Sequence, residues 1–335
     1  MHTRYHAKSN TLIVGAAFCL TATALPPITL AETTNNSDNY SANNKNTAAL
    51  PAWTTTLKRY SIDQPAQQQQ TSTLPFRTRI RGGVWLSAPT GDLRFGGPAA
   101  SDVSVEDHLD LNNPQASFTG DLTLDFKNNW KRWQLWFDAF DTSQDSTTNL
   151  PVAATVNGTS LPRGTRVQSS FAATSFGAHV GYDLFENILE LNEPDNVSDN
   201  PDAELRLHVI GGFRALNIDE SFSAPAPGVS ADYDEWHAIA EAGGRLSILV
   251  NPRESPWGSL DVSLNLLAGY GLSDGDLTTV DLFTAITWQP IPNAGFSAGY
   301  RLFDISLDSV QQSNGSNFEA DVTLAGFFLG GQITF

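Results

Sequence analysis

The sequence predicts an all-β fold, a transmembrane antiparallel up-and-down β-barrel of about ten strands. Apolar and polar residues alternate along segments of about ten residues, enough to cross a bilayer at a tilt. The connections between these segments are mostly short and long in turn, like the periplasmic turns and outer loops of such barrels. The last stretch, Asp321–Phe335, alternates up to a terminal aromatic residue. A strand that closes a barrel against the first strand leaves no edge unpaired in lipid.

Ten segments carry the alternation, and each keeps its apolar residues on one side. In chain order, the predicted strands with examples of their apolar side are Arg77–Ser87 (Ile80, Val84), Gln115–Phe126 (Phe118, Leu122), Trp130–Asp141 (Trp133, Phe137), Val167–Phe185 (Phe176, Val180), Glu204–Leu216 (Val209, Phe213), Tyr233–Val250 (Trp236, Ile248), Trp257–Gly271 (Leu264, Leu266), Asp276–Trp288 (Val280, Ile286), Ala294–Asp304 (Phe296, Tyr300) and Asp321–Phe335. In the last strand, the barrel-closing signature is Phe327, Leu329, Gly331, Ile333 and Phe335.

The connections support this assignment with two exceptions. The short ones are Lys127–Asn129, Asn251–Pro256 and Gln289–Asn293. Glu186–Asp202 is long for a periplasmic turn and Ser273–Gly275 is short for an outer loop, so eight or twelve strands remain alternatives.

Three stretches of the outer loops predict local structure. Asn157-Gly158 and Asn314-Gly315 are type I′ hairpin signals, which predict that the flanking strand pairs continue past the membrane. In Ser104–Leu111, the serine is placed to cap a short helix over Glu106–Leu111, at or inside the barrel mouth.

The N-terminal part of the chain differs in composition from the rest. Residues 1–31 predict a cleaved secretory signal, with the apolar run Thr11–Leu25 and a cleavage site at Thr29-Leu30-Ala31. Residues 32–76 are rich in Asn, Thr, Ser and Gln and predict a disordered polar arm in the periplasm. Residues 77–335 form the predicted barrel. The one cysteine, Cys19, lies in the signal, so the exported chain has no disulfide.

Charge and hydropathy exclude several classes. The 335-residue chain has a net charge of −17, which argues against a nucleic-acid partner. After the signal, no stretch approaches the ~18 consecutive apolar residues that indicate a transmembrane helix. No cofactor is expected.

The side of the strands opposite the apolar one is rich in charged residues of both signs. By strand parity, the lumen set is Arg79, Arg81, Asp121, Asp125, Asp138, Arg206, His208, Arg214, Glu241, Arg245, Asp261, Asp281 and Arg301. Arginine suits confined ion pairs because its guanidinium is planar and stays charged. Two interpretations remain open: a structural network that neutralises itself across a narrow interior, or a small pore whose arginines select anions.

Other functions rest on weaker patterns. Asp232, Asp234, Glu235 and His237, with Asp219 and Glu220 across the loop, are the best material for a hydrolase at the outer rim. Acidic outer loops are usually only solvated, and we expect no catalytic residue. His108, Glu106 and Asp107 are consecutive, so they do not converge on a metal. Loops rich in Asp, Ser and Thr would suit adhesion, and inward aromatic residues such as Trp85 would suit an apolar solute.

Several short motifs resemble a known group. Trp85-Leu86 precedes Gly91-Asp92, and Trp133-x-Leu135 is followed by Asp138. Near the other end are Gly299-Tyr300-Arg301 and Thr323-Leu324-x-Gly326. Over about Ile80–Phe335 the chain is similar to the uncharacterised Gram-negative outer-membrane β-barrel proteins. It departs from them at Phe327, where members often have proline.

The resemblance implies an outer-membrane location and supplies no catalytic residue. Together with the strand pattern, it predicts a Sec-exported barrel with its C-terminus in the periplasm. Its expected partners are outer-membrane lipid, lipopolysaccharide and the barrel assembly machinery, and its expected ligands are small solutes or ions. The predicted function is a narrow porin-like channel or a structural or surface barrel with a charged lumen. An outer-rim hydrolase or an adhesin acting through the loops remains the alternative.

Overall fold

The computed structural model describes residues 75–97, 99–184, 203–250, 258–272, 276–291, 293–311 and 317–335. The predicted signal and nearly all of the predicted arm lie outside these residues, as do the whole of Glu186–Asp202 and the Asn314-Gly315 pair. No helix in the described ranges is long and apolar enough to cross a membrane.

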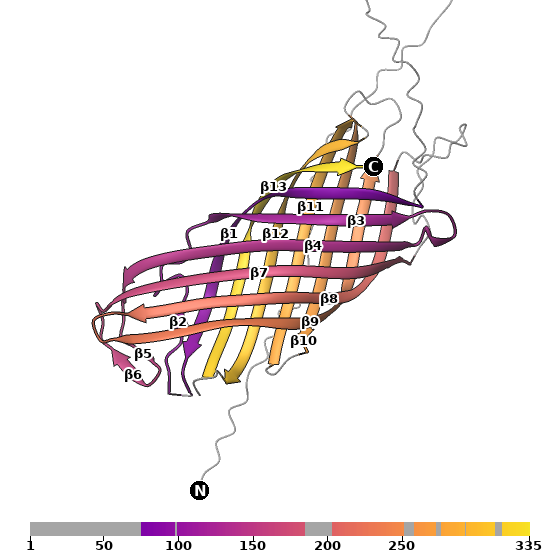
Figure 1. Cartoon of the computed structure of the whole chain (residues 1–335). Helices are drawn as coiled ribbons and strands as arrows, with labels where there is room; N and C mark the ends of the chain where they lie inside the picture. Colours follow the sequence, from indigo (N-terminus) through magenta and orange to yellow (C-terminus); the bar gives the residue numbers. More distant parts are fainter. Residues whose placement is uncertain are drawn as a thin grey trace, which may run out of the picture. The chain divides into compact units, whose positions relative to one another are not determined.

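Ten long strands form one antiparallel sheet that closes on itself, which confirms the predicted ten-strand barrel (Figure 1). The ten are β1 (Phe76–Phe95), β3 (Gln115–Phe126), β4 (Trp133–Asn149), β7 (Arg166–Asp183), β8 (Ala203–Ala224), β9 (Val229–Val250), β10 (Ser259–Gly271), β11 (Asp276–Ile291), β12 (Ala294–Gln311) and β13 (Asn317–Thr334). The short strand β2 (Val103–Ser104) pairs with the far end of β1. Strands β5 (Ala154–Val156) and β6 (Thr159–Leu161) form a separate small sheet.

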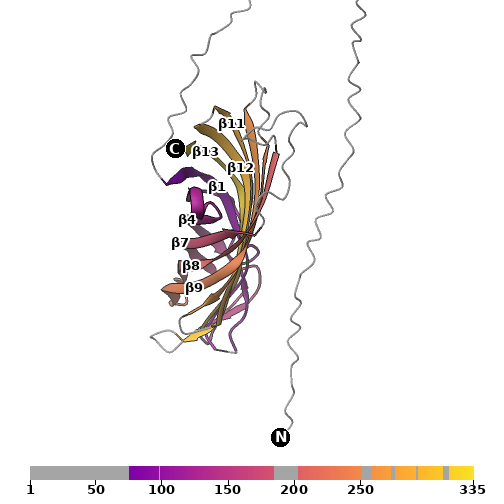
Figure 2. The same ribbon diagram turned by 90° about the vertical axis from the view of Figure 1, so that its right-hand side faces the viewer.

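The closing seam joins β1 to β13, which lie side by side in Figure 2. Their register runs from Arg79 opposite Thr334 to Phe95 opposite Phe318. The terminal Phe335 continues it, because its main-chain NH donates to the Thr78 carbonyl at 2.9 Å and its carbonyl accepts from the Thr78 NH at 3.2 Å. Closure leaves neither edge of the barrel wall without a hydrogen-bonding partner, as a wall in lipid requires.

Most strands run further outward than the alternation predicts. β1 has 20 residues and β8 and β9 have 22 each, about twice what a membrane crossing needs. β10 has only 13, because the connection to β11 is short. The barrel wall therefore rises far beyond the membrane on most sides.

Three local predictions need correction. Glu106–Leu111 is a series of turns and not a helix. Ser104 Oγ does accept the Asp107 NH at 3.1 Å, as a cap would, but Asp110 has a positive φ of 54° that stops the coil. At the other end of the barrel, Asn128 has a φ of 59° and opens a 3₁₀ turn, η1 (Asn128–Trp130). β4 therefore begins at Trp133 and not at Trp130.

The Asn157-Gly158 pair does form a tight hairpin turn, with φ values of 47° and 74°. The hairpin is that of β5 and β6, and it does not prolong β4 and β7. β4 and β7 pair as far as Asn149 and Arg166. Pro151 and Pro162 lie just beyond, and because proline has no NH to donate, the ladder stops there.

Candidate functional site

The outer surface of the barrel carries a belt of exposed apolar side chains. Phe118, Phe213, Phe296 and Phe327 are each 60% exposed or more. Tryptophans lie among the outward residues as well, and Trp130 is 64% exposed. A belt of this kind faces lipid, and its aromatic residues suit the headgroup level. The signature residues Phe327, Leu329, Ile333 and Phe335 belong to it, at 50–68% exposure, and Gly331 is exposed between them.

Strand β8 shows where the belt ends. Further along β8, beyond Val209 and Phe213, the side chains on the outer surface of the barrel are polar: Asn217, Asp219 and Ser221. At the same level, the inward residues change in the opposite sense. Arg206, His208 and Arg214 give way to the buried side chains of Leu216, Ile218 and Phe222. The barrel therefore has a polar interior within the apolar belt and an apolar interior beyond it.

Within the belt, a buried ion-pair network crosses the lumen. Arg214 contacts three carboxylates: Asp138 at 3.0 Å, Asp281 at 3.0 Å and Glu241 at 2.6 Å. Arg301 shares two of them, Asp138 at 3.1 Å and Asp281 at 2.6 Å. These side chains are at most 4% exposed. The strands β4, β8, β9, β11 and β12 each supply one member, so the network ties opposite walls together.

Aromatic rings complete this layer. The Arg301 guanidinium lies 4.5 Å from the centre of the Phe140 ring, and Arg214 lies 5.2 Å from that of Phe303. Phe140 packs edge-on against both Trp85, at 5.5 Å, and Phe303, at 5.0 Å. Cations over ring faces are attracted by the ring quadrupole. Arginines and rings thus fill the middle of the lumen together.

His179, which the strand pattern also predicts to lie in the lumen, joins the network from β7, although it is not among the residues of the predicted charge network. Its Nε2 lies 2.6 Å from Glu241 Oε2, and its ring stacks on Trp136 with centroids 4.8 Å apart. Strand parity places it inward, so the signal was present in the alternation. An isolated histidine in a strand sequence does not indicate which residue it contacts, so its pairing with Glu241 can be seen only in the folded barrel.

Toward the end of the barrel where β1 begins and β13 ends, a second set of ion pairs lines the lumen. Arg79 bridges Asp125 at 3.0 Å and Asp261 at 2.9 Å. Arg81 pairs with Asp121 at 2.6 Å, and Arg206 pairs with Glu204. The structure thus brings most of the predicted lumen set into two groups. His208 and Arg245 are also buried there, but neither contacts a carboxylate within the described residues.

Beyond the belt, the interior is filled by an apolar core. Phe95 packs on Phe222 and Phe318, and Phe318 stacks on Tyr233 with centroids 4.2 Å apart. The loop after β1 and the β5–β6 hairpin fold into this space. Their contribution is Val103, Val105, Leu109, Leu111, Ala154, Val156 and Leu161, all at most 4% exposed. The first of these loops was expected over or inside the barrel mouth, and it lies inside, whereas nothing in the alternation of the strands indicated that the β5–β6 hairpin enters the barrel.

The candidate rim hydrolase residues come together only in part: Glu235 lies near Tyr233 and His237, whereas Asp219 and Asp234 do not join them. Asp219 and Asp234 are cross-strand partners that face outward, where Asn217 Nδ2 donates to Asp234 Oδ1 at 2.9 Å. Burial and the neighbouring Asp234 raise the pKa of Asp219. His237 lies on the inner side, bonded to the Tyr233 hydroxyl at 2.8 Å. The sheet therefore separates the outward aspartates from the histidine.

Two further predicted groups have structural roles in the outer part. His108 Nδ1 accepts the Ser104 NH at 2.8 Å within the loop, and Glu106 accepts the NH of Gly91 in β1 at 2.8 Å, which fastens the loop to the barrel wall. No cluster of metal-ligating side chains occurs in the part of the chain that the structure describes. Glu220 was noted only as a neighbour of the rim, but it is fully buried in the apolar core with neither oxygen hydrogen-bonded.

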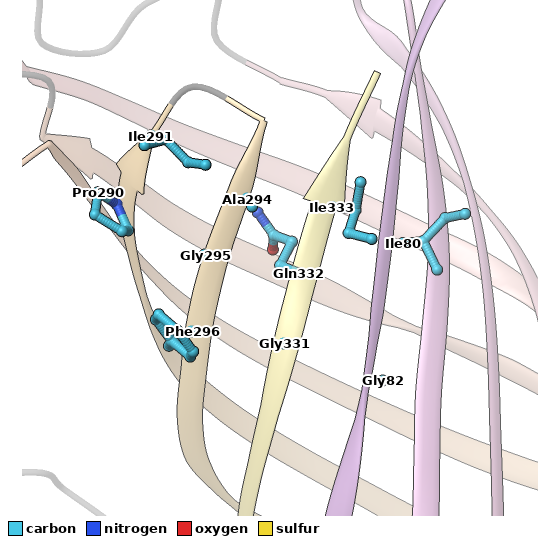
Figure 3. A pocket seen from close by; sticks show the side chains of 10 residues that line it. All are labelled: Ile80, Gly82, Pro290, Ile291, Ala294, Gly295, Phe296, Gly331, Gln332 and Ile333. Carbon is cyan, nitrogen blue, oxygen red and sulfur yellow. The ribbon is translucent and has the colours of Figure 1, made fainter.

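A groove of about 480 Å³ lies on the outer face of the seam, across β11, β12, β13 and β1 (Figure 3). Phe296 and Ile333 flank it, and the cross-strand partners Gly82 and Gly331 leave its floor bare. A Cβ atom on Gly82 would meet nothing within 4 Å, so the wall itself does not require this glycine. The groove belongs to the lipid-facing belt.

No protein-family profile and no curated protein sequence matches the chain. Among solved structures, it is similar to the outer-membrane protease OmpT of Escherichia coli, with 13% identity, a TM-score of 0.40 and coverage of 79% of this chain and 99% of that one. It is also similar to the transport unit of the E. coli autotransporter AIDA-I, with 11% identity, a TM-score of 0.36 and coverage of 80% and 92%. For the Pseudomonas putida toluene transporter TodX, the values are 8%, 0.24, 77% and 88%. Likenesses this distant say nothing about the activity of this chain.

Proposed function

We propose that the protein is an outer-membrane barrel with a lumen closed at rest, and that it acts through the folded part that rises beyond the membrane. The inversion along β8 carries this proposal. Up to Phe213 the strand has the pattern of a membrane barrel, and from Leu216 onward it has the apolar inside and polar outside of a water-soluble β protein. An extension with its own core is a stable platform at the cell surface.

Closure of the lumen supports the same function. The Arg214–Asp281 network and the aromatic rings beside it fill the middle of the lumen, and two loop segments fill the outer half. A general porin needs a continuous water path, which these layers interrupt. Outward aspartates such as Asp219, Asp234 and Asp321 surround the extension, a composition suited to the lipopolysaccharide layer and its divalent cations.

A planar-bilayer recording of the refolded chain tests the closed lumen. We expect no stable conductance steps from the wild type. The matched positive control combines two changes. Arg301→Ala removes one arginine from the mid-lumen network, and a Gly-Ser linker of equal length in place of residues 101–114 removes one loop from the outer core. Open steps from the control and none from the wild type fit the proposal. Regular steps from the unmodified barrel would refute it.

The narrow channel is the second candidate, because side chains alone close the middle of the lumen. Rotamer changes of Arg214 and Arg301 would suffice there, whereas the outer core would need its loops to leave. Conductance that appears in the wild type only under applied voltage, and whose ion preference changes in Arg301→Ala, would favour this candidate.

That the protein is not an enzyme also remains a prediction. It is supported by the separation of His237 from Asp219 and Asp234, and hydrolysis of peptides or lipids lost in His237→Ala would contradict it.

A further inference from the structure

Arg245 stands apart from the other buried arginines of the lumen. Arg79, Arg81, Arg214 and Arg301 each contact at least one carboxylate. Arg245 is 4% exposed, and its one side-chain hydrogen bond in the described part of the chain is to the Gln134 amide oxygen at 3.4 Å. An uncompensated buried charge is costly, and proteins normally give it a counterion.

The same part of the lumen contains polar groups without hydrogen-bonding partners. Both amide atoms of Asn265, the Gln332 Nε2 and the Thr123 hydroxyl are buried and unbonded. The strand register places each of them beside an arginine: Asn265 opposite Arg245, Gln332 opposite Arg81, and Thr123 opposite Arg79. Buried amides and hydroxyls are nearly always hydrogen-bonded, so these groups call for a partner.

We propose that the periplasmic half of the lumen binds a small oxyanion at Arg245, such as phosphate, sulfate or a carboxylate. The guanidinium offers a planar fork of NH donors that matches two oxygens of such an anion, and the amide of Asn265, its cross-strand partner, supplies a further donor. Gln332 and Thr123 lie beside the neighbouring Arg81 and Arg79 in the same part of the lumen. The site rests on these side chains and does not depend on whether the lumen conducts.

The anion enters from the periplasmic side. Side-chain exposure falls from 40% at Arg206 to 19% at Arg79 and to 0% at Arg214. The site thus lies between the open periplasmic end and the closed network, and arginines line the way to it. This order predicts that an anion added to the outer face alone does not reach Arg245.

Asp261 is the competing acceptor within the barrel. Its Oδ2 pairs with Arg79, whereas its Oδ1 is buried and has no partner. A carboxylate in this position repels an incoming anion. Removing its charge with Asp261→Asn therefore increases the affinity of the site, which a merely structural role of Arg245 would not predict.

The test compares thermal unfolding of the detergent-refolded chain in sodium phosphate and in sodium chloride at equal ionic strength. A ligand that binds only the folded state raises the midpoint. We expect phosphate to raise it by several degrees in the wild type and more in Asp261→Asn, with no rise in Arg245→Gln. Arg94→Gln is the matched control, because Arg94 pairs with Asp102 and Glu319 on the outer extension, and its phosphate response should equal that of the wild type.

An undiminished response in Arg245→Gln, or an equal response to chloride, would overturn the oxyanion site. A second measurement uses only the wild type, in case Arg245→Gln does not fold. Crystals soaked in selenate should show an anomalous selenium peak within hydrogen-bonding distance of the Arg245 guanidinium. A well-ordered crystal without a peak there would also overturn the proposal.

Discussion

Replacing Asp281 by asparagine tests whether the mid-lumen network holds the barrel together. Asp281 accepts from Arg214 at 3.0 Å and from Arg301 at 2.6 and 3.1 Å. Asparagine has nearly the same shape but no charge, so the variant leaves two buried arginines with the carboxylates of Asp138 and Glu241. Removing one partner of a buried ion pair costs about 3–5 kcal/mol. We expect a loss near 3 kcal/mol, because Arg214 keeps both other carboxylates.

The assay is urea unfolding in lipid vesicles, followed by tryptophan fluorescence. Asp276→Asn is the matched control on the same strand, since Asp276 is exposed and, among the residues that the structure describes, accepts only from the Tyr270 hydroxyl at 3.1 Å. Its cost should stay within about 0.5 kcal/mol. A loss in Asp281→Asn no greater than in this control would refute the reasoning.

A double-mutant cycle then locates the effect. Arg301→Gln should cost less in the Asp281→Asn background than in the wild type, because the bonds between the two side chains are already weakened. Coupling of this kind is typical of residues in one network. Additive losses would mean that Asp281 acts through Arg214 alone or through packing.

Three other predictions concern different parts of the barrel. Leu264→Arg, at a 40% exposed position of the lipid-facing belt, should lower the free energy of unfolding by about 2–4 kcal/mol. Ser306→Arg on the extension should change it little. Equal losses in the two variants would contradict the assignment of which strand side faces lipid. Deleting Phe335 removes two hydrogen bonds to Thr78, so the folded fraction on heat-modifiability gels should fall, and undiminished folding would contradict the role of the seam. Burial raises the pKa of Glu220 well above its ordinary value. Its contribution to stability is therefore greatest below the unfolded-state pKa, near 4.5, and decreases as pH rises. Glu220→Gln should reduce the fall in unfolding free energy between about pH 5 and 8, and an unchanged pH profile would contradict this role of Glu220.

The sequence predicted about ten strands, with eight or twelve as alternatives, and which side of each strand faces lipid; the structure has ten long strands. Both follow from a period of two that depends only on backbone geometry. Val209 and Phe213 indicate their environment because they lie next to His208 and Arg214, which fall on the other side of the strand. The outer ends of β8 and β9 were missed for the same reason. From Leu216 onward the inward residues are apolar and the outward residues are polar. The alternation therefore continues, but its apolar side now faces the interior of the barrel, and near the turn the sequence resembles that of a loop.

The candidate site could be predicted only in part. Parity placed Arg214 and Asp281 on the inner side, but parity cannot say which charges meet, because that depends on the stagger of strands around the barrel. The pairing of Arg79 with Asp261 joins residues 182 positions apart in the chain. The filling of the outer barrel depends on where loops fold, and Val105 and Leu109 are buried only because the wall of β1 and its neighbours rises around them.

The reversal at the membrane boundary explains why the interior needs two different means of closure. Within the belt the wall must be apolar outside, so the alternating inward positions are left to polar side chains, and arginine–carboxylate pairs satisfy one another where little water enters. Beyond the belt the outside faces water, and the same alternation can turn its apolar side inward. Within the described residues, Glu220, one residue after the outward Asp219, is the one carboxyl that the extension buries without a partner. Its shift toward the neutral form follows from the same reversal, because it is buried between the aromatic cross-strand neighbours Phe171 and Tyr233 and no arginine there pairs with it. The extension is therefore held by hydrophobic packing, which salt does not screen, and the spanning part by ion pairs that are screened little because they are buried, so high salt should weaken neither part strongly.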